Sequence, residues 1–162
     1  MGRSHCSSER PAWSRWLAAV LLVLLATGGS IAVEAESPDS IAIVIGSGSA
    51  IRGVSVDELR EVYLRRQRLW KNGLPAMPVN LPADSPVRVA FSRRVLGRLP
   101  EDLESYWRRL YFEGVRPPLV LRTSQAVCAY VAVEASAIGY VRLHEVDAAS
   151  CRVLFVLTEG SE

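Results

Sequence analysis

The stretch IAIVIGSGSAIRGVSVDELREVYLRR, residues 41–66, contains the strand, loop and helix from which the fold can be predicted. Ile41–Gly46 is apolar, rich in β-branched residues and closed by glycine, which predicts a strand buried on both faces. Residues 46–53 then form a loop. Ser55 precedes a helical segment and Glu58 follows three residues later, which is the capping-box spacing. The apolar residues of this helix share one face: Leu59, Val62 and Tyr63.

Strands and helices continue to alternate toward the C-terminus. The further predicted strands are Ala76–Leu81, Leu119–Arg122, Ala137–Leu143 and Cys151–Glu159. Pro78 places the first of these at a sheet edge or makes it short. The further predicted helices are one capped by Asp84 or Ser85 and ended by Gly97, one over Leu99–Phe112, and one capped by Thr123 or Ser124. Alternation of this kind predicts a single α/β domain with a central sheet flanked by helices.

Residues 1–35 have the composition of a targeting segment. Three arginines precede WLAAVLLVLLA, residues 16–26, which has the length of a signal-peptide core and is short for a bilayer span. Cleavage after Ala35 or after Ala32 would release the domain, residues 36–162. An uncleaved membrane anchor is the alternative. We therefore expect a periplasmic or secreted protein.

Charge and composition exclude several classes. The chain has 162 residues and a formal net charge of +2, far from the basic excess of nucleic-acid-binding proteins. The region after residue 35 contains a single histidine, His144, and no Cys-x-x-Cys, so we expect neither a metal site nor a cofactor. No nucleophile motif accompanies His144, and we expect no enzyme activity. Cys128 and Cys151 either pair in an oxidising compartment or stay as two buried thiols.

Three predicted loops place small hydroxyl residues before helices. In α/β sheets, ligands bind beyond the carboxyl ends of strands, where helix starts gather, and the free N–H groups of a helix start stabilise anions. The candidate ligand-binding residues are Ser47, Ser49, Asp84, Ser85 and Ser124. The competing interpretation is that these residues are ordinary helix caps. Arg88 lies one turn into its helix, where it either reaches back to an anion or is surface charge.

Four segments in this order resemble the phosphate-type substrate-binding proteins of ABC importers. They are SVDELREVYLRRQRLWKNG, LPADSPVRVAFSRRVLG, YWRRLYFEG and TSQAVCAYVAVEASAIGYV, and the resemblance covers roughly residues 41 to 143. It implies one lobe of a type 2 periplasmic-binding protein with a central mixed sheet, a small oxyanion such as phosphate as ligand, and a membrane permease or other envelope protein as partner.

The chain departs from that family at its phosphate loop. Leu81 stands at the arginine position, Ala83 at the aspartate position, and Pro86 and Val87 replace the glycine and threonine that follow the serine. Ser85 is the donor that remains. Two functions stay open: an exported oxyanion-binding protein, and a periplasmic interaction module without ligand. In the second, the contact surface would include Trp70, Tyr111 and Phe112.

Overall fold

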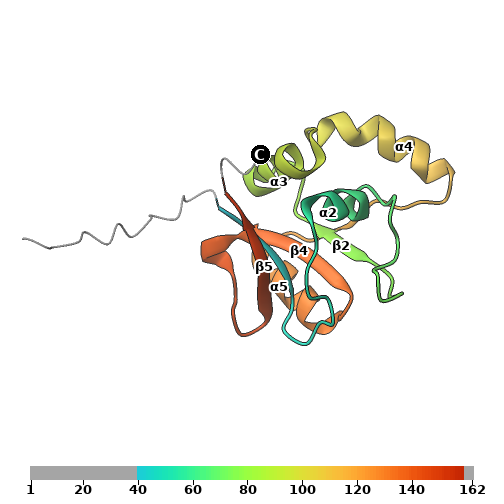
Figure 1. Cartoon of the computed structure of the whole chain (residues 1–162). Coiled ribbons are helices and arrows are strands. Elements are labelled where there is room, and N and C mark those ends of the chain that lie inside the picture. The colour runs from blue at the N-terminus through green and yellow to red at the C-terminus, as the bar shows by residue number, and fades with distance from the viewer. Residues whose placement is uncertain (1–39, 159–162) are drawn as a thin grey trace, which may run out of the picture. The chain divides into compact units, whose positions relative to one another are not determined.

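The computed structural model describes residues 40–158, which form an α/β domain (Figure 1). The predicted targeting segment, residues 1–35, and both cleavage positions lie outside these residues. Within residues 40–158, no helix combines the length and apolar character needed to cross a bilayer.

The strands and helices follow the predicted order. The strands are β1 (Ile41–Gly46), β2 (Met77–Asn80), β3 (Leu119–Val120), β4 (Ala137–Arg142) and β5 (Cys151–Leu157). The α-helices are α2 (Val56–Tyr63), α3 (Pro86–Phe91), α4 (Glu104–Phe112) and α5 (Ser124–Val133). A π-helical turn, Ser92–Leu96, continues α3, and two 3-10 turns cover Glu101–Leu103 and Leu143–Glu145. Gly97 ends the π-helical turn in the left-handed conformation, with φ 66°, as its position at the end of the predicted helix requires.

The five strands form one mixed sheet in the order β3-β2-β4-β1-β5. Strand β2 is parallel to β3 and to β4. Strand β1 is antiparallel to both of its neighbours, β4 and β5. It follows that β1 alone runs against the other four strands.

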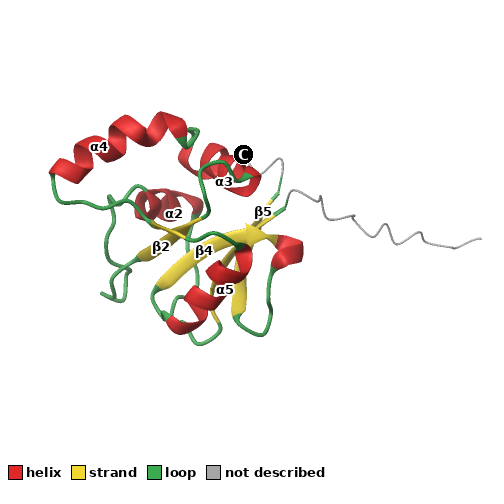
Figure 2. Cartoon of the chain, turned by 180° about the vertical axis from the view of Figure 1, so that it is seen from behind, coloured by secondary structure: helices red, strands yellow, loops and turns green. Residues whose placement is uncertain are grey.

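Helices cover both faces of the sheet. Helix α5 lies on one face, in front of β4 in Figure 2, and α2 lies on the other. On the α2 side, Phe91 stacks on Tyr140 of β4 with ring centroids 3.8 Å apart, and Tyr63 of α2 contacts Phe91 at 4.7 Å. On the α5 side, Val127 and Val131 are fully buried. The predicted α/β class, with a mixed central sheet flanked by helices, is confirmed.

Pro78 left two alternatives for β2, an edge position or a short strand. The short strand is confirmed, with four residues, and the edge position is wrong. Strand β2 lies between β3 and β4, and the edge strand β3 has two residues. Pro78 is tolerated because N–H groups alternate between the two sides of a strand. The N–H of Met77 points toward β4, where it donates to the Ser136 carbonyl. The backbone nitrogen of Pro78, which carries no hydrogen, therefore faces β3. No hydrogen bond is lost there, because β3 pairs with β2 only from Val79 onward.

The two cysteines of the domain are in contact. Cys128 on α5 and Cys151 on β5 are buried free thiols whose sulfur atoms lie 2.7 Å apart. Burial raises the pKa of the Cys151 thiol to about 12, and its hydrogen bond with Cys128 adds to the shift. The structure thus brings together the two residues whose pairing the sequence left open.

Candidate functional site

The strand directions decide which predicted loops meet. The strands β2, β3 and β4 run in the same direction, so their carboxyl ends lie together. They form one edge of the sheet in the sense of a row of strand ends, which is distinct from the edge strand β3. Strand β1 runs the other way, so the loop after it, residues 46–53, lies at the opposite edge. The sheet therefore separates Ser47 and Ser49 from the candidate residues of the two other loops, Ser85 and Ser124.

A pocket of about 610 Å³ lies at the edge where β2, β3 and β4 end. Leu81 and residues 85–87 reach it from β2, and residues 122–125 reach it from β3. Arg142, His144 and Glu145 complete the lining at the end of β4. Ser85 and Ser124, two of the five candidate residues, thus line one pocket.

Ser85 sits at the cap position of α3, but its hydroxyl does not cap the helix. Its backbone is extended, with φ −66° and ψ 127°, and its side chain makes no hydrogen bond to the helix start. Pro86 follows and has no N–H to satisfy. The half-buried Ser85 hydroxyl and the N–H of Val87 are therefore left at the pocket without a partner from the helix.

Helix α5 presents a second set of N–H groups to the same pocket. Thr123 is its cap, because the Thr123 Oγ1 atom accepts a hydrogen bond from the Ala126 N–H at 3.1 Å. The N–H groups of Ser124 and Gln125, in the first turn, have no acceptor within the helix. The Ser124 hydroxyl donates to a Glu145 carboxylate oxygen at 2.5 Å. Ser124 thus offers the pocket its backbone N–H, while its side chain is bonded to Glu145.

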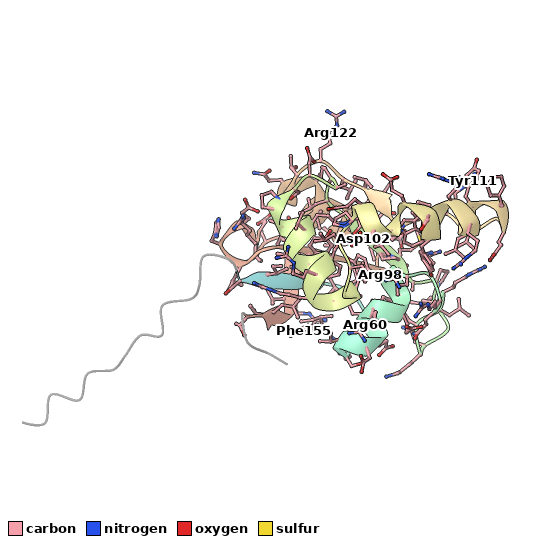
Figure 3. The ribbon with its side chains drawn as sticks, turned by 90° about the horizontal axis from the view of Figure 1, so that it is seen from above. Arg60, Arg98, Asp102, Tyr111, Arg122 and Phe155 are labelled. Carbon is pink, nitrogen blue, oxygen red and sulfur yellow. The ribbon has the colours of Figure 1, made fainter. Side chains whose placement is uncertain are left out.

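Basic residues from two strand ends surround this pocket. Arg142 is half-buried, and Arg122 is exposed and projects away from the domain in Figure 3. Glu145 is the acidic residue of the lining. The sequence carried a signal for these arginines, because Arg122 closes the predicted strand Leu119–Arg122 and Arg142 lies one residue before the end of the predicted strand Ala137–Leu143. That signal becomes informative only once β3 and β4 are known to be parallel.

Arg88 is buried next to the pocket, and the surface-charge interpretation of this residue is wrong. It is 8% exposed, and one of its guanidinium NH2 groups donates to the carbonyl of Leu81 at 2.9 Å. Its buried Nε has no hydrogen-bond partner, and Arg88 makes no ion pair with any described residue. An uncompensated buried charge is costly, and this one lies directly behind Leu81, a residue of the pocket wall.

A buried polar network that sequence reasoning missed holds the exit of β2 in place. The Tyr140 hydroxyl donates to the side-chain oxygen of Asn80 at 3.1 Å and accepts from the Leu81 N–H at 3.4 Å. Burial raises the pKa of Tyr140 to about 12, against the opposing effect of Arg88. Asn80 was the available signal, since it is a polar residue inside an otherwise apolar predicted strand.

The other candidate residues do not line this pocket. Ser49 is buried, donates to the Ala135 carbonyl at 2.6 Å and accepts from the Ile51 N–H at 3.3 Å. Its hydroxyl therefore closes the loop after β1. Ser47 is exposed in the same loop, and Asp84 is exposed in the turn before Ser85.

The predicted contact surface of the interaction module is in part wrong. Trp70 is 5% exposed, and its indole N–H donates to the Ser136 carbonyl at 2.8 Å. It is therefore a core residue. Tyr111 and Phe112 at the end of α4 are 67% and 84% exposed, as that hypothesis requires.

Solved structures share this fold over most of the chain. One is a phosphate ABC transporter substrate-binding protein with bound phosphate from Clostridium perfringens, at TM-score 0.57 and 19% identity. Another is an ABC-type phosphate transport receptor from Vibrio cholerae, at TM-score 0.54 and 20% identity. Each match covers 71% of this chain but less than half of the other protein, 44% and 45%. The resemblance inferred from the sequence is confirmed for the fold. The sequence matches no protein-family model and no curated protein.

Proposed function

We propose that this chain is an exported solute-binding-like protein that holds phosphate or another small oxyanion at the carboxyl ends of β2, β3 and β4. The observation that carries the proposal is the Ser85 hydroxyl, which lines the pocket without capping α3. It lies in one pocket with the first turn of the ten-residue helix α5. Hydroxyl and N–H groups that lack acceptors are the donors that an oxyanion binds.

The buried charge of Arg88 supports the same proposal. Its guanidinium has no acidic partner among the described residues and bonds to the wall of the pocket through Leu81. An anion in the pocket would offset part of the cost of burying that charge. Arg88 would thus supply the positive charge that the family places at the position of Leu81.

Association with ABC-type import and location outside the cytoplasm belong to the same proposal. The two solved proteins that share the fold are named for phosphate transport, and the N-terminal segment has the composition of a signal peptide. A membrane permease is the partner that such a role implies. We assign no enzyme activity.

Calorimetry of the full chain with phosphate, sulfate and molybdate tests the proposal. We expect at least one of these anions to bind, and we expect Ser85→Ala to weaken binding by roughly tenfold or more, since hydrogen bonds to charged groups contribute about 1.5–3 kcal/mol. Ser47→Ala is the matched control, an exposed serine at the other edge of the sheet that should leave affinity unchanged. Absence of binding to all three anions would overturn the proposal.

One observation favours the interaction module as a second candidate. Helix α4 contains no buried residue, and Tyr111 and Phe112 at its end are exposed. Exposed aromatic side chains of this kind are enriched at protein interfaces. The same calorimetry separates the two candidates, because the interaction module predicts no heat of binding with any of the three anions.

A further inference from the structure

A second pocket, with a different lining from the first, contains four arginines. It has a volume of about 410 Å³ and lies between α2, the end of the π-helical turn and α4. The arginines are Arg60, Arg66, Arg98 and Arg109. Leu64, Leu96, Leu103, Ser105 and Tyr106 complete the lining, which contains no acidic residue. The two pockets share no lining residue, and Figure 3 shows Arg60 on the side of the domain opposite to Arg122, so this pocket is separate from the proposed oxyanion site.

The positive charge of this pocket is only half compensated. Arg60 pairs with Asp57 at 2.9 Å and Arg66 with Glu61 at 3.1 Å. Arg98 and Arg109 make no ion pair with any described residue. Asp102, which follows shortly after Arg98, uses one carboxylate oxygen to accept from the Leu99 N–H at 3.1 Å. Two guanidinium groups therefore remain without a counter-charge.

Packing holds several of these groups in place. The Nε of Arg60 donates to the Val95 carbonyl at 2.6 Å, which ties α2 to the π-helical turn. The Tyr106 hydroxyl donates to the Leu64 carbonyl at 2.6 Å, which ties α4 to the end of α2. The guanidinium of Arg109 lies 5.7 Å from the centre of the Tyr106 ring. Like charges gathered by fixed elements repel one another, and a bound anion would relieve that repulsion.

We propose that this pocket binds an oligophosphate, a soluble ligand with several phosphoryl groups in a row. The guanidinium group binds phosphate oxygens in pairs, and arginines from three separate elements suit a ligand with more than one anionic group. Leu64, Leu96 and Leu103 are all buried, so the leucine side chains of the lining do not project outward to insert into a bilayer. This argues for a soluble ligand over a lipid headgroup.

Calorimetry with tripolyphosphate tests this proposal on the full chain, in a metal-free buffer that contains inorganic phosphate. The double variant Arg98→Gln, Arg109→Gln should weaken tripolyphosphate binding by about tenfold or more. The matched control is Arg93→Gln, Arg108→Gln. It removes the same charge from exposed positions of the same two regions, outside the pocket lining. The control should retain affinity within about twofold, because exposed charges outside the pocket are screened.

Three results would overturn the proposal: no tripolyphosphate binding, equal loss in both double variants, or capture by anionic phospholipid vesicles without any binding of tripolyphosphate. Circular dichroism verifies that each variant is folded, and Arg98→Gln alone replaces the double variant if that one unfolds. Ser85→Ala should leave tripolyphosphate binding unchanged. The failure of the first pocket to bind phosphate and the failure of this pocket to bind oligophosphate are therefore distinguishable.

Discussion

Ser55 and Ser85 occupy the same position at the start of a helix, yet their hydroxyl groups have different roles. The Ser55 hydroxyl accepts a hydrogen bond from the Glu58 N–H at 3.1 Å and so caps α2. The Ser85 hydroxyl makes no such bond and lines a pocket. A serine with unused hydrogen-bonding capacity at a helix start is available to a ligand.

This difference predicts opposite responses to the same substitution. Ser55→Ala should lower the free energy of unfolding by about 1 kcal/mol, the usual cost of losing a cap. Ser85→Ala should change it by less than about 0.5 kcal/mol in the absence of anions, as at other positions that lack a specific interaction. Urea unfolding of the two variants checks this. A larger loss from Ser85→Ala than from Ser55→Ala would show that Ser85 is a structural cap.

The sequence predicted which residues occupy cap positions, but not whether the Ser85 hydroxyl bonds to its helix or faces a pocket. Both serines precede a predicted helix. The capping-box spacing of Ser55 and Glu58 predicted the first hydrogen bond, but no pattern in the sequence says that the Ser85 hydroxyl stays unbonded to its helix and lines a pocket. Arg88 is a similar case. Its position within an amphipathic helix allows either exposure or burial, and its burial depends on the carbonyl of Leu81, which is set by how β2 leaves the sheet.

At the scale of elements, α5 packs against β1 through a close approach at Gly46. A β-carbon built on Gly46 would lie 2.2 Å from the Val131 carbonyl oxygen. Because that atom belongs to the backbone of α5, it cannot move aside without shifting the helix. The close packing of α5 on β1 at this point therefore requires a glycine at position 46.

Gly46→Ala should consequently destabilise the domain by about 2–3 kcal/mol or more, as overpacking against a fixed backbone does. Gly48→Ala is the control two residues away, since a β-carbon there would meet nothing within 4 Å. That variant should stay within about 0.5 kcal/mol of the wild type. Thermal unfolding of both variants measures the difference, and similar midpoints for the two would contradict this account of the packing.

Strand positions were predictable, whereas strand directions were not. Ile41–Gly46 was predicted as a strand buried on both faces, and every residue of β1 is buried. The direction of β1 follows from its pairing with β4 and β5, which are about a hundred residues away in the sequence. That long-range pairing separates Ser47 and Ser49 from the pocket, and no local pattern reports it.

At the scale of the whole molecule, the stability of the domain depends on whether its surroundings are oxidising, because two of its thiols can form a disulfide bond. Cys128 and Cys151 are already in contact, 23 residues apart in the chain. Oxidation would close that loop and remove conformational freedom from the unfolded chain. The buried Cys151 thiol has a raised pKa, so its own reactive thiolate is scarce near neutral pH.

Full oxidation should raise the free energy of unfolding by about 3 kcal/mol. Mass spectrometry confirms that the bond has formed, and urea unfolding with and without reductant measures its effect. Cys128→Ser is the control and should show no dependence on the oxidant. A quantitatively oxidised wild type with an unchanged unfolding midpoint would contradict the expected gain.

The overall fold was predictable because hydrophobic patterning, helix caps and the order of elements all agree with it. The site was predictable only in part, since Ser85 and Ser124 line one pocket whose charged residues come from strand ends brought together by the sheet. The identity of a ligand depends on a few hydrogen-bond donors and charged groups. The chain differs from the family it resembles at the positions that would supply them, Leu81, Ala83, Pro86 and Val87.

The most direct test of the central claim, oxyanion binding in the pocket at the ends of β2, β3 and β4, is a phosphate titration followed by two-dimensional proton–nitrogen NMR. We predict that the backbone N–H signals of Val87, Ser124 and Gln125 shift together and saturate with one dissociation constant. The N–H signals of Ser47 and Gly48, at the opposite edge of the sheet, should not move. Unchanged signals for the three pocket residues at saturating phosphate would contradict the account.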